Sequence, residues 1–177
     1  GAEALALLRS RHGVGDGSDL GRISSQQVYL SSLVRKMEAS GTLNNPVTVY
    51  KIATAATQNM QLSTSLDSIP TMLSIAQTLK GISPANVQFV QYPGSTGGTG
   101  IYAGKVQPNL TLGHQLSSLI SSDTPFTLGT QGVDRGSVTE ASPSGAPTSS
   151  AAPLPGATVI NGLVGQSAST YTCSKTR

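Results

Sequence analysis

One stretch of this chain, residues 129–156, limits how much of it can form a packed core. The stretch consists mainly of Gly, Ser, Thr and Pro, and such a composition buries too little apolar surface to offset the entropy of folding. We therefore expect a folded part over residues 1–125, a flexible linker over 126–157 and a short tail, or the start of a truncated module, over 158–177. The tail has only a brief apolar patch between Val159 and Val164, which is too small for a core of its own.

The first 125 residues mix helical and strand patterns, which predicts the α/β class. Helices are predicted at about 24–39, 68–79 and 110–122, and the first of them has a core stripe of Leu30, Leu33, Val34 and Met37. A strand is predicted at 86–92, and residues 60–65 also alternate as a strand does. Residues 46–57 fit either a short strand or a helix, and the strong helix formers at 2–8 leave open whether Arg9 to Arg11 continue the helix or begin a strand.

The charge of the chain is small but unevenly placed. The whole chain carries a net charge of +3, too little for the dense basic face of a nucleic-acid-binding domain. Residues 9–36 alone hold five Lys and Arg against two Asp, which is also +3 (5 − 2). An anionic partner is therefore expected to bind there, and nucleic acid is not expected as a partner.

Covalent and membrane features give further expectations. The single Cys173 excludes an internal disulfide framework. No apolar run approaches the roughly 18 residues that a membrane span needs, and the chain opens at Gly1 without a methionine, so we expect the true N-terminus to lie elsewhere.

The clearest chemical pattern begins with Arg9-Ser10-Arg11, continues through a glycine-rich loop that carries Asp19, and ends with Arg22 and Gln26, one helical turn apart. Guanidinium groups bind two phosphate oxygens at once, and a helix N-terminus presents unpaired N–H groups, so the pattern suits a phosphate or pyrophosphate. Asp19 would either orient an arginine or accept a proton from an attacking hydroxyl. The competing interpretation is that these arginines form surface ion pairs with Asp16 and Asp19 and have little further effect.

This arrangement resembles the late motif of the LytR-CpsA-Psr family, which has the form R-x-R, a variable loop, D-x-x-R and a Gln four residues later. The resemblance implies the C-terminal part of a mixed α/β domain, with helices packed on a sheet, followed here by a disordered tail. It also implies an enzyme that transfers a glycopolymer from a polyprenyl pyrophosphate carrier to peptidoglycan, assisted by Mg²⁺. Such an enzyme would act at the extracellular face of the bacterial cytoplasmic membrane, held by an N-terminal anchor that is missing from this chain.

By this resemblance Arg9, Arg11, Arg22 and Gln26 hold the pyrophosphate, and Asp19 and Arg22 are the catalytic residues. Many members carry an additional arginine just before the Gln, where this chain has Ser25. The family's metal-binding aspartates belong to an earlier part of the domain, so no metal ligand is assigned here and this chain alone is expected to be inactive. The alternative is a non-catalytic module that binds an anionic wall polymer or a lipid pyrophosphate.

Other patterns are weaker. His12 and His114 are isolated histidines without metal-ligand spacing, and Gly97 to Gly100 lacks the ending of a phosphate loop. Asn109-Leu-Thr111 is a formal glycosylation sequon, which we do not expect a bacterial chain of this type to use.

Overall fold

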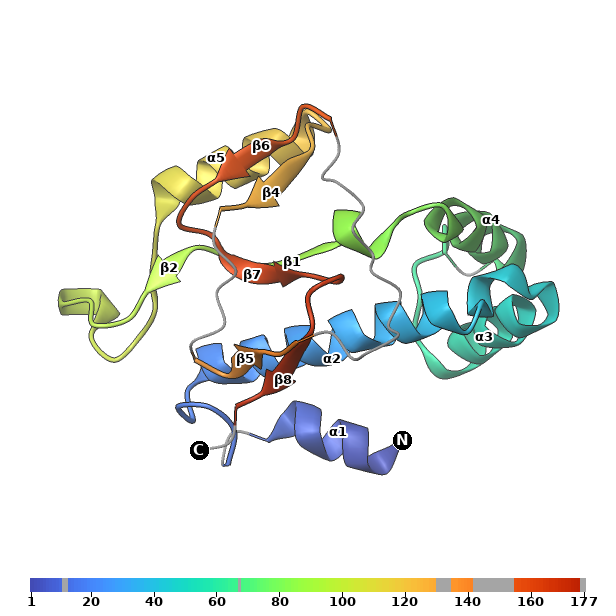
Figure 1. The fold of residues 1–177 in the computed structure, drawn as a ribbon, viewed down its shortest axis with the longest axis horizontal. Coiled ribbons are helices and arrows are strands. Elements are labelled where there is room, and N and C mark those ends of the chain that lie inside the picture. The colour runs from blue at the N-terminus through green and yellow to red at the C-terminus, as the bar shows by residue number, and fades with distance from the viewer. Residues whose placement is uncertain (11–12, 67, 130–134, 142–154, 176–177) are drawn as a thin grey trace. The chain divides into compact units, whose positions relative to one another are not determined.

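The computed structural model describes residues 1–10, 13–66, 68–129, 135–141 and 155–175 (Figure 1). They fall into two compact units, one formed by Gly1–Ser32 with Pro84–Arg177 and the other by Leu33–Ser83. Helices and short strands both occur, so the predicted mixed α/β class is confirmed. None of the helices in these ranges is long and apolar enough to cross a membrane.

The first unit contains helix α1 (Ala2–Arg9), the first part of α2 (Asp19–Ala39) and α5 (Leu110–Ser121). Two 3₁₀ turns, η2 (Pro84–Asn86) and η3 (Gly100–Tyr102), connect its other elements. Asn109 begins α5 because its side chain accepts a hydrogen bond from the backbone N–H of Leu112, 3.1 Å away. The sequon asparagine therefore has a local structural role as a helix cap.

Short strands of the first unit pair across long sequence distances. β1 (Gln88–Gln91) pairs antiparallel with β7 (Val164–Ser167), β4 (Phe126–Leu128) parallel with β6 (Thr158–Ile160), and β5 (Ser137–Thr139) antiparallel with β8 (Thr172–Ser174). A further pair, β2 (Gly94–Ser95) and β3 (Gln107–Pro108), is antiparallel and local. Figure 1 shows β7 beside β1 and β8 beside β5.

Because of these pairings, much of the described chain after residue 125 belongs to the first folded unit. The described part of the expected linker contains β4 and β5, and the expected tail supplies β6, β7 and β8. Residues 130–134 and 142–154 of the linker lie outside the described residues. The C-terminal residues add strands to an existing unit, which is why their small apolar patch needs no core of its own.

The core of the first unit lies between α5 and the strands. Leu116 from α5 packs with Ile160 and Leu163, and five partly buried residues surround them: Val90, Leu112, Leu119, Phe126 and Leu128. Ile160 and Leu163 are 1% and 2% exposed, and burying an aliphatic side chain of this size contributes about 1.5–3 kcal/mol. Two of the three central side chains therefore come from the segment that was expected to be a tail.

The buried face of α2 is more polar than expected. Leu30 and Leu33, predicted as part of its core stripe, are 41% and 40% exposed, whereas Ser24, Ser25, Gln27 and Ser31 are buried. Small hydroxyl side chains allow strands to come close to the helix, and they satisfy buried polar groups there. The Ser24 hydroxyl lies 2.7 Å from that of Ser137 in β5.

A second buried contact fixes β7 to the same helix. The Gln166 amide, 1% exposed, donates to the Ser31 hydroxyl over 2.7 Å and accepts from the Thr172 hydroxyl over 3.0 Å. The predicted core stripe was wrong for Leu30 and Leu33, whereas Val34 and Met37 are half-buried, because local periodicity does not indicate which face of a helix meets polar strands.

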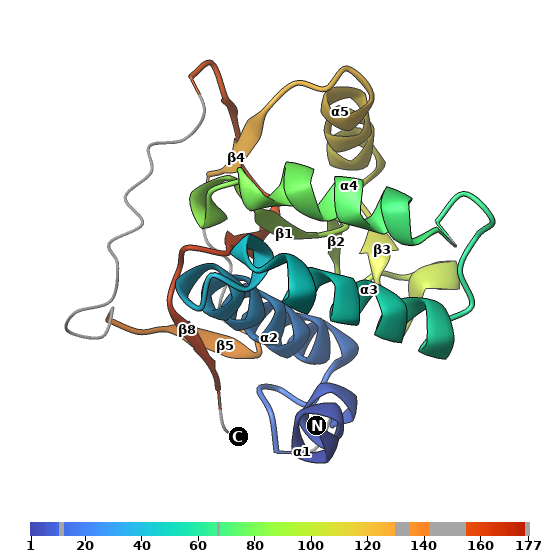
Figure 2. The ribbon, with the colours of Figure 1, turned by 90° about the vertical axis from the view of Figure 1, so that its right-hand side faces the viewer.

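The second unit is helical. It contains the last part of α2, a 3₁₀ turn η1 (Thr42–Asn44), α3 (Pro46–Asn59) and α4 (Ile69–Lys80), with α3 and α4 in contact (Figure 2). The open choice for residues 46–57 is resolved as a helix, since the Asn45 side chain caps the N–H groups of Val47 and Thr48. Residues 60–65 do not form a strand.

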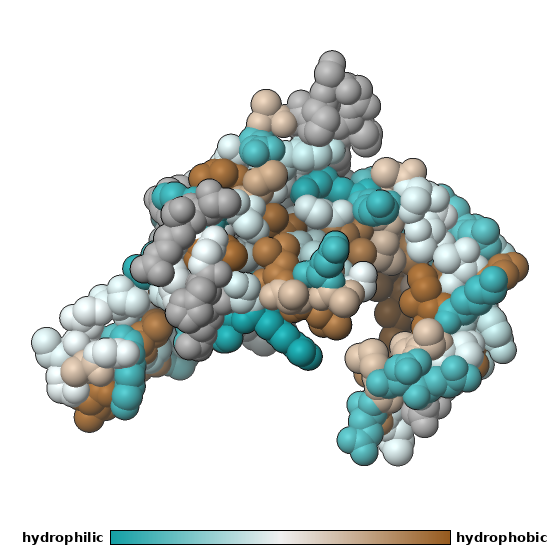
Figure 3. All heavy atoms as spheres, turned by 90° about the horizontal axis from the view of Figure 1, so that it is seen from below, coloured by the Kyte–Doolittle hydropathy of each residue, from teal (hydrophilic) through white to brown (hydrophobic). Residues whose placement is uncertain are grey.

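An apolar cavity lies within this helical unit. Its volume is about 260 Å³, and every lining residue is apolar: Met37, Leu43, Val49, Ile52, Ala53, Ala56, Leu66, Met72, Ile75, Ala76 and Leu79. Figure 3 shows hydrophobic surface over α3 and α4. The helices of this unit thus leave apolar surface that their own side chains do not fill.

Candidate functional site

The end of α1 lies against the second turn of α2. The Gln26 side-chain amide donates to the carbonyl oxygen of Leu8, 3.1 Å away. Leu8 belongs to the last turn of α1, whose carbonyl groups have no partner within the helix. This bond joins the end of α1, where Arg9 is the last helical residue, to α2, and Arg22 lies one turn before Gln26 on α2.

Arg22 is held in place by the acid three residues before it. Its Nη2 lies 2.8 Å from Oδ1 of Asp19, and the two side chains are 34% and 53% exposed. The Nε of Arg22 is shut off from solvent and has no hydrogen-bond partner among the described residues. The Asp19 carboxylate thus fixes the direction of the guanidinium.

The loop before α2 is organised by Asp16 and Ser18. Oδ1 of Asp16 accepts hydrogen bonds from the backbone N–H and from the hydroxyl of Ser18. These two bonds, together with the charge of Arg135, outweigh partial burial and hold the pKa of Asp16 below its ordinary value. An added Cβ at Gly21 would lie 2.7 Å from Oδ1 of Asp16, so the carboxylate can take this position only beside a glycine.

Ser18 also accepts hydrogen bonds at the N-terminus of α2, where the sequence predicted that a phosphate would bind. The Gly21 N–H donates to the Ser18 hydroxyl over 3.1 Å, and the Arg22 N–H donates to the Ser18 carbonyl over 3.1 Å. Fewer free backbone donors therefore remain than a bare helix N-terminus would offer.

Four of the five predicted site residues are described: Arg9 ends α1, and Asp19, Arg22 and Gln26 lie in the first two turns of α2. Arg11, and His12 beside it, lie outside the described residues. His114 is exposed on α5, away from this motif in the sequence. The described ranges hold no group of three His, Cys, Asp or Glu side chains that could bind a metal ion, so the residues of this site do not fit Mg²⁺ by themselves.

Sequence reasoning missed Arg135 and gave Asp16 only as an ion-pair partner of the motif's arginines. The role of Asp16 in the loop had a local signal, since Asp-x-Ser before a helix favours side-chain bonds to the backbone of the turn. Arg135 had no signal, because it lies within the Gly-, Ser-, Thr- and Pro-rich stretch and reaches Asp16 only through strand pairing, with Nη1 3.5 Å from Oδ2 of Asp16.

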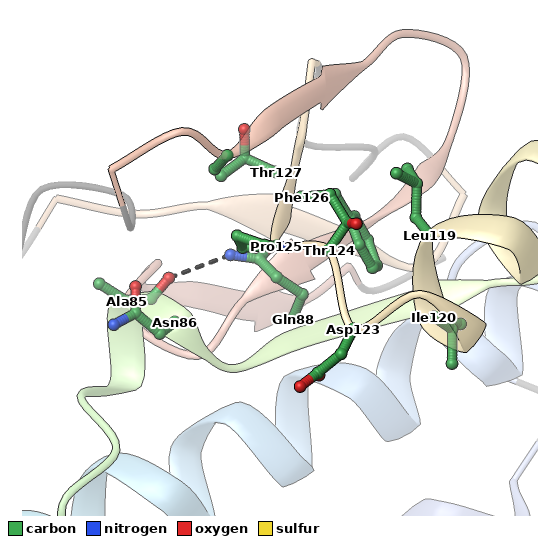
Figure 4. Close-up of a pocket in the computed structure, with 11 residues that line it drawn as sticks. Ala85, Asn86, Gln88, Leu119, Ile120, Asp123, Thr124, Pro125, Phe126 and Thr127 are labelled. Carbon is green, nitrogen blue, oxygen red and sulfur yellow. Dashed lines mark hydrogen bonds between the residues drawn. The ribbon is translucent and has the colours of Figure 1, made fainter.

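The first unit also has a larger cavity of different chemistry. Its volume is about 540 Å³, and it is lined by β1, the end of α5 and the segment that leads into β4 (Figure 4). Asp123 is the only ionisable residue among those that line it, and the others include Gln88, Thr124 and Phe126. A carboxylate without a cation repels phosphate, so this cavity suits an uncharged ligand that forms hydrogen bonds. This cavity is therefore a poorer candidate for an anion site than the arginine motif.

The chain is thus a mixed α/β protein with an arginine-, aspartate- and glutamine-containing motif where α1 ends and α2 begins. Comparison with known proteins identifies the family. The model of the LytR_cpsA_psr family matches residues 1–116, and the chain belongs to that family. The resemblance noted on Arg9 to Gln27 is thus confirmed over most of the chain.

A relative from Corynebacterium glutamicum, the cell wall biosynthesis protein LcpA, is 36% identical over 107 residues. The match covers 60% of this chain and 20% of the relative, so the chain spans about a fifth of the length of that protein. No solved structure matches the chain.

Proposed function

We propose that this chain is the phosphate-holding, C-terminal part of a cell-envelope phosphotransferase that moves a glycopolymer from a polyprenyl pyrophosphate carrier to peptidoglycan. The proposal rests on membership of the LytR_cpsA_psr family and on a relative named for cell wall biosynthesis. The structural observation that carries it is the Gln26 to Leu8 bond, which joins the end of α1 to α2, the helix that bears the Asp19–Arg22 pair.

Each residue of the site receives a role from its contacts. Arg9 and Arg22, with Arg11 from the same motif, bind the pyrophosphate oxygens, since planar guanidinium groups match pairs of phosphate oxygens. Gln26 holds α1 in place and keeps its amide oxygen for a ligand or a water molecule. Asp19 orients Arg22, because the guanidinium already engages its carboxylate at 2.8 Å.

In this role the arginines assist the reaction electrostatically. Phosphoryl transfer builds charge on the oxygens around phosphorus, and fixed guanidinium groups stabilise that charge without rearranging during the step. The Mg²⁺ expected for the intact domain would take its ligands from residues outside the described part of this chain.

The remaining parts of the substrate need different surfaces. A prenyl chain requires apolar surface, which the charged side chains of the arginine motif do not offer. The glycopolymer and its peptidoglycan acceptor place the activity in the cell envelope, at the outer face of the cytoplasmic membrane.

Calorimetric titration with a short prenyl pyrophosphate, with and without Mg²⁺, tests the proposal. The native chain is compared with Arg9→Ala and Arg22→Ala, and Lys51→Ala serves as a control because Lys51 is an exposed cation on α3. We expect both arginine variants to lose affinity and the control to keep it. Tight binding that neither arginine substitution changes would disprove the assignment.

The competing function is a module that binds an anionic wall polymer or a lipid pyrophosphate without transferring it. The observation in its favour is that Asp19 is engaged by Arg22, which suits holding more than proton transfer. Transfer assays with the full-length protein, a lipid-linked donor and Mg²⁺ separate the two. Transfer that Arg22→Ala abolishes supports the enzyme, and binding without any transfer supports the module.

A further inference from the structure

Residues beyond the family match are bonded to the loop that precedes α2. The backbone N–H of Gly15 donates to the carbonyl of Lys175 over 2.7 Å, and the N–H of Asp16 donates to the carbonyl of Arg135 over 3.0 Å. The backbone N–H of Lys175 in turn donates to the carbonyl of Gly136 over 2.9 Å. The start of β5 and the chain just after β8 therefore fix the loop from both sides.

The packing at this contact leaves no free space. An added Cβ would lie 2.0 Å from the Arg135 carbonyl oxygen if placed on Gly15, and 2.1 Å from the Gly21 carbonyl oxygen if placed on Gly136. Gly15 also has φ of 54°, a conformation that favours glycine. Arg135 is thus held against the first turn of α2, next to the residue that precedes Arg22.

The side chain of Arg135 extends from this point along the surface of the loop. Its guanidinium bridges Asp16, at 3.5 Å, and the Thr96 hydroxyl, at 3.1 Å, and the side chain is 45% exposed. An exposed ion pair of this length contributes little and yields to a stronger anion. A guanidinium has five N–H donors, so these two contacts leave others for a ligand.

Arg135 adds to the positive charge around the site. Among the described site residues, Arg9 and Arg22 are opposed by Asp16 and Asp19, which gives a net charge of zero (2 − 2), and Arg135 makes this group positive by one (3 − 2). Arg11 of the same motif contributes one further positive charge, so Arg135 strengthens an attraction for pyrophosphate that the motif already provides.

We propose that Arg135 is a further phosphate-binding residue of this site, carried to it by the strand pair β5 and β8. The inference rests on the proposed function, since it adds a contact to the same pyrophosphate. Arg135 stands 113 residues after Arg22 (135 − 22) and beyond the family match at residue 116. Long-range strand pairing thus supplies a part of the site that lies outside the motif.

The test is calorimetric titration of the whole chain with inorganic pyrophosphate, at fixed ionic strength. Arg135→Gln is expected to weaken binding by about 12- to 140-fold, as the loss of a charge-assisted hydrogen bond predicts, and Arg135→Lys to recover part of it. Lys51→Gln, which removes the same charge from α3, is expected to leave the affinity unchanged.

Asp16→Asn separates phosphate binding from loop support. Its side-chain oxygen can still accept the Ser18 bonds, but the competing charge is gone, so we expect pyrophosphate to bind more tightly. If Arg135 only holds Asp16 in place, Asp16→Asn will weaken binding as much as Arg135→Gln does, and the proposal fails.

The same titrations distinguish this proposal from the proposed function. Loss of affinity in Arg9→Ala and Arg22→Ala, with Arg135→Gln equal to the Lys51→Gln control, would overturn the role of Arg135 alone. A native chain that does not bind pyrophosphate would overturn both. Thermal unfolding of each variant, expected to match the native chain closely because the ion pair is exposed, excludes misfolding as the cause.

Discussion

Replacing Gln26 by Leu removes the bond that holds α1 at the site while keeping the size of the side chain. Helix α1 has eight residues and no buried residue, and a helix of this length is not stable in water without tertiary contacts. A neutral hydrogen bond contributes about 0.5–1.5 kcal/mol, so its loss lowers the equilibrium constant for docking of α1 by roughly 2- to 12-fold. The apparent dissociation constant for pyrophosphate rises as the docked fraction falls.

Two measurements follow this change. Hydrogen exchange reports the docking of α1, and we expect the amide of Leu5, which bonds to the Gly1 carbonyl over 3.2 Å, to exchange faster in Gln26→Leu. Calorimetry reports the affinity for pyrophosphate, which is expected to fall without a comparable loss of global stability. Gln77→Leu, at an exposed position on α4, controls for the added apolar side chain. Native exchange rates in α1 of Gln26→Leu would refute the reasoning.

Further substitutions test the interior and the pH response. Ser31→Ala leaves the buried Gln166 amide without its acceptor, so the free energy of unfolding measured with denaturant should fall by about 1–3 kcal/mol. Leu163→Ala should cost about 2–5 kcal/mol, whereas Val159→Ala, at a position that is 58% exposed, should cost far less; equal effects would show that the C-terminal strands are not part of the core. The lowered pKa of Asp16 means that its contribution is present above about pH 4 and is lost as the pH falls through the native pKa. Native protein should therefore lose more stability than Asp16→Asn between about pH 5 and pH 2, by under about 1 kcal/mol because the group is exposed.

Local signals predicted the elements that local interactions determine. The helix expected at 68–79 is α4 at Ile69–Lys80, and the helix expected at 110–122 is α5 at Leu110–Ser121. Apolar periodicity and helix-ending residues act within a few turns, so the sequence records them directly. The strand expected at 86–92 is β1 for the same reason.

Elements that depend on distant partners could not be predicted. Strands β5 and β8 have three residues each, too few for an alternating pattern to be recognised. β5 lies within the glycine- and proline-rich stretch, whose composition predicted a flexible linker, and β8 follows that stretch. The buried polar face of α2 also depends on a distant partner. Ser31 can be buried there because its hydroxyl accepts a hydrogen bond from Gln166.

Residues of the candidate site also differ in whether local sequence predicts them. Arg9, Asp19, Arg22 and Gln26 form a motif within one short segment, so the sequence identifies them, although not the Leu8 contact that Gln26 makes. Arg135 belongs to no motif, and only the backbone bonds from Gly15 and Asp16 bring it near.

The bond between Gly15 and Lys175 also imposes an order on the making of this protein. The two residues are 160 positions apart (175 − 15), and a ribosome that adds about 5–20 residues per second needs roughly 8–32 s to cover that distance. During that interval the arginine motif has been synthesised, but the strand that secures its loop has not. The loop that carries the motif therefore gains this backbone bond only after residue 175 has been synthesised.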